Sequence, residues 1–219
     1  MNLRKYQFAI FDYDGVILDS NQIKTESFRE SLREYGNDEV SKFIDYHISN
    51  GGVSRYDKFK YFFEDILKIK EYESEYNLAL AHFSSFNKKN LKEAKIVEGL
   101  TEVLEIFKSL DLNLYVVSGS DKEELNSLLN QKKVSKYFTE ILGSPTRKES
   151  HCSRIYKSEN YGPSLYFGDS RLDFICAEAI KSDFIFVEKY SDWRDIKIIE
   201  ERRFFSKIST FDNLLSILK

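Results

Sequence analysis

Short apolar runs that stop abruptly at polar residues recur along this chain and constrain its fold more than any other feature. The first run covers residues 6–11 and ends at Asp12. Runs of the same kind cover residues 114–117, 140–142, 165–167 and 184–187. Apolar residues at helical spacing lie between them, at 100–107, 125–129 and 174–180. This alternation predicts an α/β fold with a doubly wound parallel sheet, which binds ligands beyond the carboxyl ends of its strands.

One region breaks the alternation. Residues 20–90 hold no convincing strand pattern, and their apolar residues recur at helical spacing. Gly36 and the pair Gly51-Gly52 separate the helical segments. We therefore predict a helical bundle inserted after the first strand. The predicted domains are an α/β core, residues 1–17 and 91–219, and a helical domain, residues 18–90.

Composition and charge exclude several classes of protein. Of the 219 residues 42% are apolar, which is enough for a packed core and argues against a disordered chain. The formal charge is −3, so no basic field indicates a nucleic-acid partner. No uncharged apolar stretch approaches the ~18 residues of a membrane helix, so we expect no membrane partner. Cys152 and Cys176 form no disulfide framework, and we expect reduced thiols and a cytoplasmic location.

Two carboxylates follow the first apolar run at once. Asp12 and Asp14 are separated by one residue, and Gly15 then lets the chain turn. Carboxylates at the end of a buried strand are costly unless a cation or a reacting group lies between them. The alternative is a solvated turn, in which Asp and Gly are favoured for their backbone geometry alone.

The second run ends in groups suited to a phosphoryl oxygen. Ser118 offers a hydroxyl, and Gly119 follows it. Ser120 and Glu123 have the spacing of a capping box, which would open a helix with free backbone N–H groups. Plain helix capping is the simpler interpretation of Ser120 and Glu123.

A cation and a third carboxylate follow later runs. Lys148 could neutralise a phosphate as a point charge, although most surface lysines do nothing of the kind. Asp169 brings a carboxylate to another strand end, where it suits a hard divalent ion. Asp173 lies three residues after Ser170 and could simply complete a capping box.

These stretches, in this order, resemble the four motifs of the haloacid dehalogenase superfamily of phosphohydrolases. The matching stretches are Asp12 to Val16, Val116 to Ser120, Lys148, and Gly168 to Asp173. The helical insertion resembles the α-helical cap of the branch that holds phosphoglycolate phosphatases, β-phosphoglucomutases and sugar phosphatases. The resemblance implies a Rossmann-like, three-layer α/β/α core with an inserted cap.

One motif departs from the family pattern. The family usually has a proline directly after the lysine of its third motif, and this chain has Glu149 there. Arg147 therefore stays an alternative to Lys148 as the cation that binds phosphate.

The resemblance also implies roles for the motif residues. Asp12 would be the nucleophile that forms an aspartyl-phosphate, and Asp14 the general acid and base. Mg²⁺ would be held by the carboxylates of Asp12 and Asp169 and by the backbone carbonyl of Asp14. Ser118, with the neighbouring Gly119, and Lys148 would stabilise charge on the phosphoryl oxygens.

The loop around the glycine pair is the best candidate for substrate selection. Its Gly-Val-Ser-Arg resembles the cap loop with which β-phosphoglucomutase holds the non-reacting end of its substrate, so Arg55 would meet a substrate phosphate. In the alternative interpretation Ser54 and Asp57 cap the next helix, while Arg55 and Lys58 are solvated. His47 alone is more typical of a partly buried helix residue than of a ligand.

We therefore expect a Mg²⁺-dependent phosphatase that acts on a small phosphorylated metabolite, a sugar or sugar-acid phosphate. The alternative is a mutase that returns the phosphoryl group to the same substrate, because both activities would use the same core residues. A catalytically silent binding module is a third hypothesis, disfavoured because no core acid is missing. The oligomeric state has no signal in the sequence.

Overall fold

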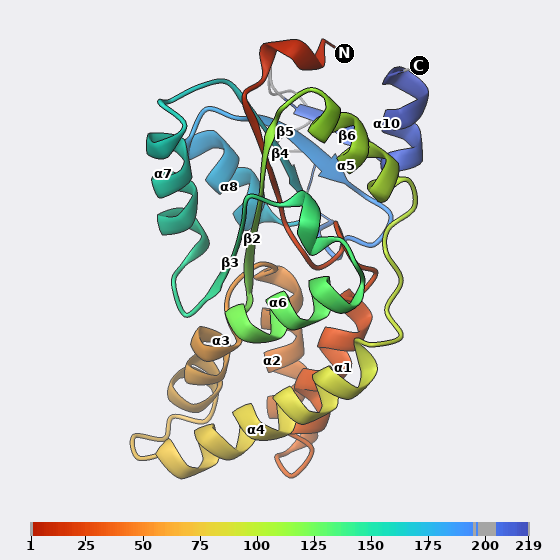
Figure 1. The fold of residues 1–219 in the computed structure, drawn as a ribbon. Helices are drawn as coiled ribbons and strands as arrows, with labels where there is room; N and C mark the ends of the chain where they lie inside the picture. Colours follow the sequence, from red (N-terminus) through yellow and green to blue (C-terminus); the bar gives the residue numbers. More distant parts are fainter. Residues whose placement is uncertain (1, 195, 197–204, 219) are drawn as a thin grey trace.

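A six-stranded sheet forms the centre of the larger domain (Figure 1). The computed structural model describes residues 2–194, 196 and 205–218. The strand order is β3-β2-β1-β4-β5-β6, and all neighbouring strands are parallel. The strands are β1 (Phe8–Phe11), β2 (Asn113–Asp121), β3 (Glu140–Ser144), β4 (Ser164–Gly168), β5 (Asp183–Val187) and β6 (Phe205–Ile208). The predicted parallel sheet is thus confirmed.

The edge strand β6 was not among the predicted strands. Its middle residues, Ser206 and Lys207, are polar and exposed. A short edge strand with one open side needs no continuous apolar run, so the pattern that marks the buried strands is missing here.

Helices cover both faces of the sheet and make the core a three-layer structure. Alternate residues of β1 belong to two different apolar clusters: Ala9 and Phe11 to one, Phe8 and Ile10 to the other. Since successive side chains of a strand point to opposite faces, the two clusters lie on opposite sides of the sheet. The core helices are α5 (Leu100–Ser109), α6 (Lys122–Gln131), α7 (Lys148–Ser158), α8 (Arg171–Ala179) and α10 (Phe211–Leu218).

A separate helical bundle follows β1 and lies against the core near α6 (Figure 1). Its own apolar cluster is rich in phenylalanine and runs from Phe28 to Phe83. Its helices are α1 (Asn21–Ser31), α2 (Asn37–Ser49), α3 (Arg55–Tyr61), which continues as the π-helical turn η2 (Phe62–Ile66), and α4 (Glu73–Asn90). The predicted helical insertion is present, and we call it the cap.

The two chain segments that join cap and core lie side by side. Leu18 and Ile96 form an isolated antiparallel bridge, and Asp19 N–H donates to the Lys95 carbonyl at 2.9 Å. We propose residues 18–90 as the cap and residues 1–17 and 91–219 as the core. Within that proposed core, residues 1, 195, 197–204 and 219 lie outside the described part of the chain.

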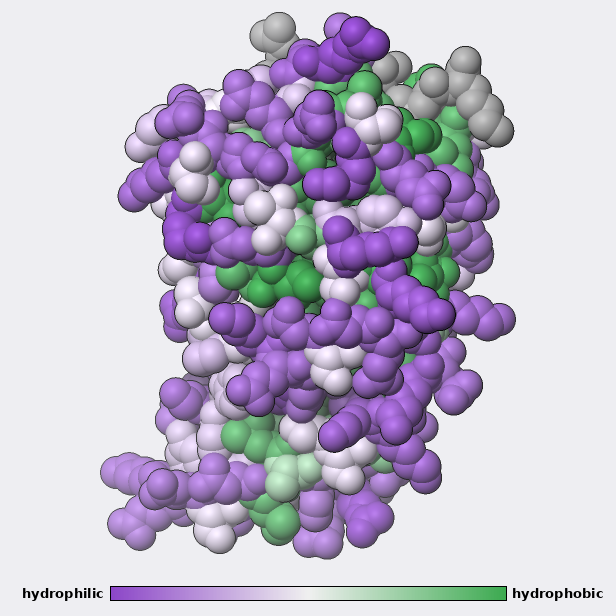
Figure 2. Space-filling view, viewed as in Figure 1, coloured by the Kyte–Doolittle hydropathy of each residue, from purple (hydrophilic) through white to green (hydrophobic). Residues whose placement is uncertain are grey.

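The face of the molecule seen in Figure 2 is mainly hydrophilic over both domains. Figure 2 shows one face on which hydrophilic side chains dominate and apolar atoms are visible in small areas between them. None of the described helices is long and apolar enough to cross a membrane.

Cys152 and Cys176 are both free and buried.

Candidate active site

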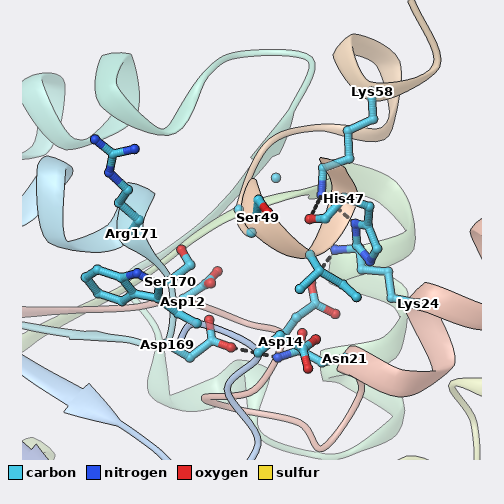
Figure 3. A pocket seen from close by; sticks show the side chains of 16 residues that line it. Asp12, Asp14, Asn21, Lys24, His47, Ser49, Lys58, Asp169, Ser170 and Arg171 are labelled. Atoms are coloured by element: carbon cyan, nitrogen blue, oxygen red, sulfur yellow. Dashed lines mark hydrogen bonds and ion pairs between the residues drawn. The ribbon is translucent and has the colours of Figure 1, made fainter. Parts of the chain in front are cut away.

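A pocket lies where the carboxyl ends of the strands meet the cap (Figure 3). About 550 Å³ of space free of protein atoms lies at this site, counted together with the open solvent that adjoins it. Its core side carries the carboxylates of Asp12, Asp14 and Asp169. Its cap side carries the basic residues Lys24, His47 and Lys58. A concave site with carboxylates on one side and basic groups on the other suits a small polar ligand.

Asp12 is the first residue after β1 and is buried. Its Oδ1 accepts the Tyr13 backbone N–H at 2.7 Å and lies 2.7 Å from Lys148 Nζ. No donor of the described residues reaches its other oxygen, Oδ2. Burial and the nearby carboxylate of Asp173 raise the pKa of Asp12 to about 7, although Lys148 opposes the shift. The Asp12 carboxylate thus has one oxygen that is held and one that is available.

Lys148 begins α7 and is only 2% exposed. Its Nζ lies 2.7 Å from Oδ1 of Asp12 and 2.7 Å from Oδ1 of Asp173. Burial alone would lower the pKa of Lys148, but the two carboxylates raise it. Arg147 is the exposed residue before the helix. Of the two candidate cations, Lys148 is therefore the one beside Asp12.

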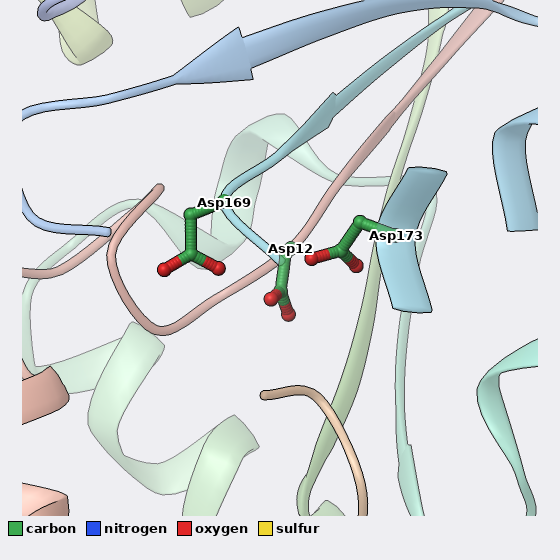
Figure 4. A group of neighbouring side chains, drawn as sticks. All are labelled: Asp12, Asp169 and Asp173. Atoms are coloured by element: carbon green, nitrogen blue, oxygen red, sulfur yellow. The ribbon is translucent and has the colours of Figure 1, made fainter. Parts of the chain in front are cut away.

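Asp169 follows β4, and Asp173 lies in the first turn of α8 (Figure 4). Oxygens of Asp12, Asp169 and Asp173 come within 4.8 Å of one another. Both oxygens of Asp173 already accept hydrogen bonds. The donors are Lys148 Nζ, Tyr166 Oη, and the N–H and Oγ of Ser170. The predicted capping box at Ser170 is present.

Asp169, by contrast, keeps one oxygen without a described donor. Its Oδ2 accepts Asn21 Nδ2 at 2.6 Å, and no described group donates to its Oδ1. Burial and the charges of Asp12 and Asp173 raise the pKa of Asp169 well above its usual range. A divalent cation would relieve this repulsion, so the free oxygens of Asp12 and Asp169 fit a hard metal ion. Asp173 is less suited as a ligand because its oxygens are engaged.

Gly15 allows the Asp169 carboxylate to lie close to the backbone of the loop that follows β1. Its φ is +75°, and a Cβ at this position would lie 2.3 Å from Oδ2 of Asp169. Any larger residue would displace the Asp169 carboxylate and would also be strained in this left-handed conformation.

Asp14 lies in a different electrostatic environment from Asp12. It forms an ion pair with Lys24 and accepts hydrogen bonds from Ser20 Oγ at 2.8 Å and Ser120 Oγ at 3.1 Å. Burial alone would raise the pKa of Asp14, but the charge of Lys24 and these hydrogen bonds lower it. Two neighbouring carboxylates are thus held with different proton affinities, an arrangement typical of acid–base sites.

The second motif lies at the end of β2. Ser118 is buried, and its Oγ accepts the Ser120 N–H at 3.0 Å. Gly119 lines the pocket. The predicted capping role of Ser120 is wrong, because Asp121 caps α6 by accepting the Glu123 N–H at 3.0 Å. Ser120 instead turns its hydroxyl to Asp14.

Arg55 does not line the pocket. Its guanidinium binds Glu124 of the core helix α6 through two bonds of 3.1 and 2.6 Å, and it also donates to Ser84. The helix α3 that begins at Arg55 is capped by Ser54, which accepts the Asp57 N–H at 3.2 Å. The predicted substrate contact of Arg55 has no counterpart in this geometry, and its guanidinium instead joins cap to core.

The sequence analysis did not predict a function for several pocket residues, among them Asn21, Lys24 and Lys58. Lys24 and Asn21 lie in the first cap helix and contact Asp14 and Asp169. Lys58 is 2% exposed, so the solvated side chain of the alternative interpretation is wrong for this residue. The spacing of Lys24 four residues after Ser20 places both on one face of a helix, which is the only signal we find for it.

Fold and site together define an α/β enzyme whose acidic site is covered by a helical cap. The family model for haloacid dehalogenase-like hydrolases matches residues 9–187. The chain belongs to the haloacid dehalogenase-like hydrolases.

A curated relative indicates which kind of hydrolase within that family the chain resembles. A phosphoglycolate phosphatase of Photobacterium profundum is 26% identical over 193 residues, covering 79% of each chain. By family membership and this relative, the enzyme is a phosphatase, that is, a phosphoric monoester hydrolase.

Solved structures agree with the fold. A predicted phosphoglycolate phosphatase from Haemophilus somnus 129PT superposes with a TM-score of 0.73 at 16% identity, over 100% of both chains. A candidate β-phosphoglucomutase from Thermotoga maritima gives a TM-score of 0.68 at 19% identity, over 97% of this chain and 98% of that one. At such identities the likeness establishes the fold alone.

Proposed function

We propose that this enzyme uses Mg²⁺ to hydrolyse a small phosphate monoester, a sugar or sugar-acid phosphate, through an aspartyl-phosphate on Asp12. The observation that carries the proposal is the asymmetry of the Asp12 carboxylate. One oxygen is fixed by Lys148 and a backbone N–H, and the other has no described donor. The carboxylates of Asp12 and Asp169 offer oxygens within 4.8 Å of each other. A nucleophile needs this combination of fixed orientation and a free lone pair.

In the first step, the free oxygen of Asp12 attacks phosphorus and the ester P–O bond breaks. The leaving oxygen takes a proton from Asp14. Asp14 is paired with Lys24, which favours its ionised form. To act as an acid, its carboxyl group must therefore take up a proton and separate from Lys24.

In the second step, a water molecule attacks the phosphorus of the aspartyl-phosphate. Asp14 accepts a proton from this water, and the bond between the Asp12 oxygen and phosphorus breaks. The ionised form of Asp14 is the form that this step requires. The net reaction consumes ester and water and releases alcohol and inorganic phosphate.

Charge on the transferred group would be stabilised by the ammonium of Lys148, the hydroxyl of Ser118 and the backbone N–H of Gly119. Lys148 is next to Asp12, and Gly119 lines the same pocket. Mg²⁺ would be held by the carboxylates of Asp12 and Asp169 and by the Asp14 carbonyl, which accepts no hydrogen bond from a described donor. When bound, the ion supplies positive charge for the phosphoryl oxygens.

A screen of sugar, sugar-acid and simple alcohol phosphates with Mg²⁺ tests the proposal. We expect sustained release of inorganic phosphate from at least one small ester. Transfer of the phosphoryl group to another hydroxyl of the same substrate, without phosphate release, would favour a mutase. No turnover of any ester, including activated aryl phosphates, would favour a silent binding module.

We also expect the enzyme to act in the cytoplasm.

A further inference from the structure

We infer that Lys58, held by His47 in the cap, recognises a second anionic group on the substrate. The substrate would then be a short phosphate ester that also carries a carboxylate or a second phosphate. This inference rests on the proposed function and narrows its substrate class.

Contacts among three cap helices fix the position of Lys58. Its Nζ lies 2.7 Å from Nδ1 of His47 and 3.3 Å from the His47 carbonyl oxygen. Nε2 of His47 lies 3.0 Å from Oγ1 of Thr25. Thr25 belongs to α1, His47 to α2 and Lys58 to α3. The ammonium is therefore placed by the cap fold and is not a mobile surface charge.

Lys58 differs from the other buried cations of the site because none of the described carboxylates forms an ion pair with it. Lys24 pairs with Asp14, and Lys148 pairs with Asp12. Among the described residues, no carboxylate lies within 4 Å of Lys58 Nζ. An ammonium has three N–H donors, and the two acceptors from His47 leave one donor for the pocket. A buried, uncompensated charge is costly, so this position is suited to a ligand anion.

The surrounding charges also favour an anion. Burial, followed by the nearby charge of Lys24, lowers the pKa of Lys58 well below its usual range. Asp14 and Asp192 act in the opposite direction, and Lys148 adds to the lowering. An anion between the cap cations would reverse the repulsion and favour the charged form of Lys58. The pKa of His47 is lowered by burial and by Lys58, so its ring is neutral and can accept from the ammonium.

The position of Lys58 determines where the second anionic group of the substrate would lie. Lys58 enters the pocket from the cap, whereas Asp12 and Asp169 lie on the opposite, core side (Figure 3). A phosphoryl group at Asp12 would leave the far end of a short ester close to the cap. The pocket is lined by charged side chains on both its core and its cap side, so both charged ends of a short ester would meet groups of the site.

Steady-state kinetics with three small esters test the inference. The probes are 2-phosphoglycolate with its carboxylate, ethane-1,2-diol bisphosphate with a second phosphate, and ethyl phosphate with no second anion. The enzymes are wild type, Lys58→Met, Lys58→Gln and the control Lys60→Met, which removes an exposed lysine from the same helix. The readout is the ratio of kcat/KM for each anionic ester to that for ethyl phosphate.

We expect wild type and Lys60→Met to prefer one anionic ester, and both Lys58 variants to lose about 10- to 100-fold of that preference. Which ester is preferred distinguishes carboxylate from phosphate. No preference in the wild type, or an unchanged ratio in the variants, would overturn the inference. The wild-type ratio is decisive even if a variant fails to fold. Absence of phosphate release from every ester would instead overturn the proposed function.

Discussion

The core and the cap each place a buried lysine at the same pocket, and the two lysines differ in their partners. Lys148 of the core lies between the carboxylates of Asp12 and Asp173, and its pKa is raised despite burial. Lys58 of the cap forms no ion pair with a described carboxylate; its close polar partner is the neutral His47, and its Nζ also lies over the Phe28 ring. Its pKa is lowered by burial and by Lys24.

The two lysines are therefore preorganised in different ways, one with its counter-charges in place and one without. The core cation Lys148 is compensated within the folded chain by the carboxylates of Asp12 and Asp173. The cap cation lacks its counter-charge until a ligand arrives. Chemistry that is common to many substrates would then depend on the core, and selection among substrates on the cap.

The largest effect is expected at the nucleophile. Asp12→Asn should lower kcat by about 10⁴-fold or more, because the amide cannot form the aspartyl-phosphate. Phosphate release with the best substrate measures this loss, and circular dichroism checks the fold. Asp19→Asn, a neighbouring position outside the pocket, is the matched control and should stay close to wild type. Substantial activity in Asp12→Asn would remove Asp12 from the nucleophile role.

Removal of divalent ions should abolish turnover. Chelation leaves Asp12 and Asp169 mutually repelling, and added Mg²⁺ should restore activity. It should also raise Tm in the absence of substrate, because the ion binds the folded state only; at 100 times Kd the gain is about 2.7 kcal/mol. Full activity and an unchanged Tm after exhaustive chelation would contradict the metal assignment.

The two lysines should respond oppositely when each is replaced by methionine. Lys148→Met leaves Asp12 and Asp173 uncompensated and should lower the free energy of unfolding by about 3–5 kcal/mol. Lys58→Met removes an uncompensated charge and should leave that free energy within about 1 kcal/mol of wild type, or raise it. Urea denaturation without ligands measures both. Equal destabilisation by the two changes would erase the contrast between core and cap.

The smallest effect is expected at the contact between cap and core. Arg55→Gln should lower kcat/KM by about tenfold or less, and by the same factor for all substrates, because Arg55 binds Glu124 and lies outside the pocket. Glu124→Gln should give a similar loss, and the double variant little more. A loss confined to one substrate would instead make Arg55 a substrate contact.

The core of the site could be predicted from sequence because its chemistry is tied to strand ends. Asp12, Ser118 and Asp169 each end an apolar run, and parallel strands bring such positions to one edge of the sheet. The separation of Lys148 from Arg147 needed the structure, because adjacent residues of a helix start point in different directions.

The cap half of the site could not be predicted in the same way. Lys24 and Lys58 lie on helices, and a charged residue at a helical position gives the same pattern whether it faces solvent or a pocket. Burial of Lys58 depends on how α3 packs against α1 and α2. Arg55 is the opposite case. Its loop resembles a known binding loop, but the guanidinium of Arg55 binds Glu124 and does not enter the pocket.

Trapping the covalent intermediate tests the central claim most directly. Borohydride reduces an aspartyl-phosphate to homoserine, and peptide mass spectrometry locates the change. With substrate and Mg²⁺ present during turnover, we predict homoserine at position 12 and nowhere else, and none without substrate. Sustained phosphate release under the same conditions, with Asp12 unmodified after reduction, would contradict the claim that Asp12 is the nucleophile.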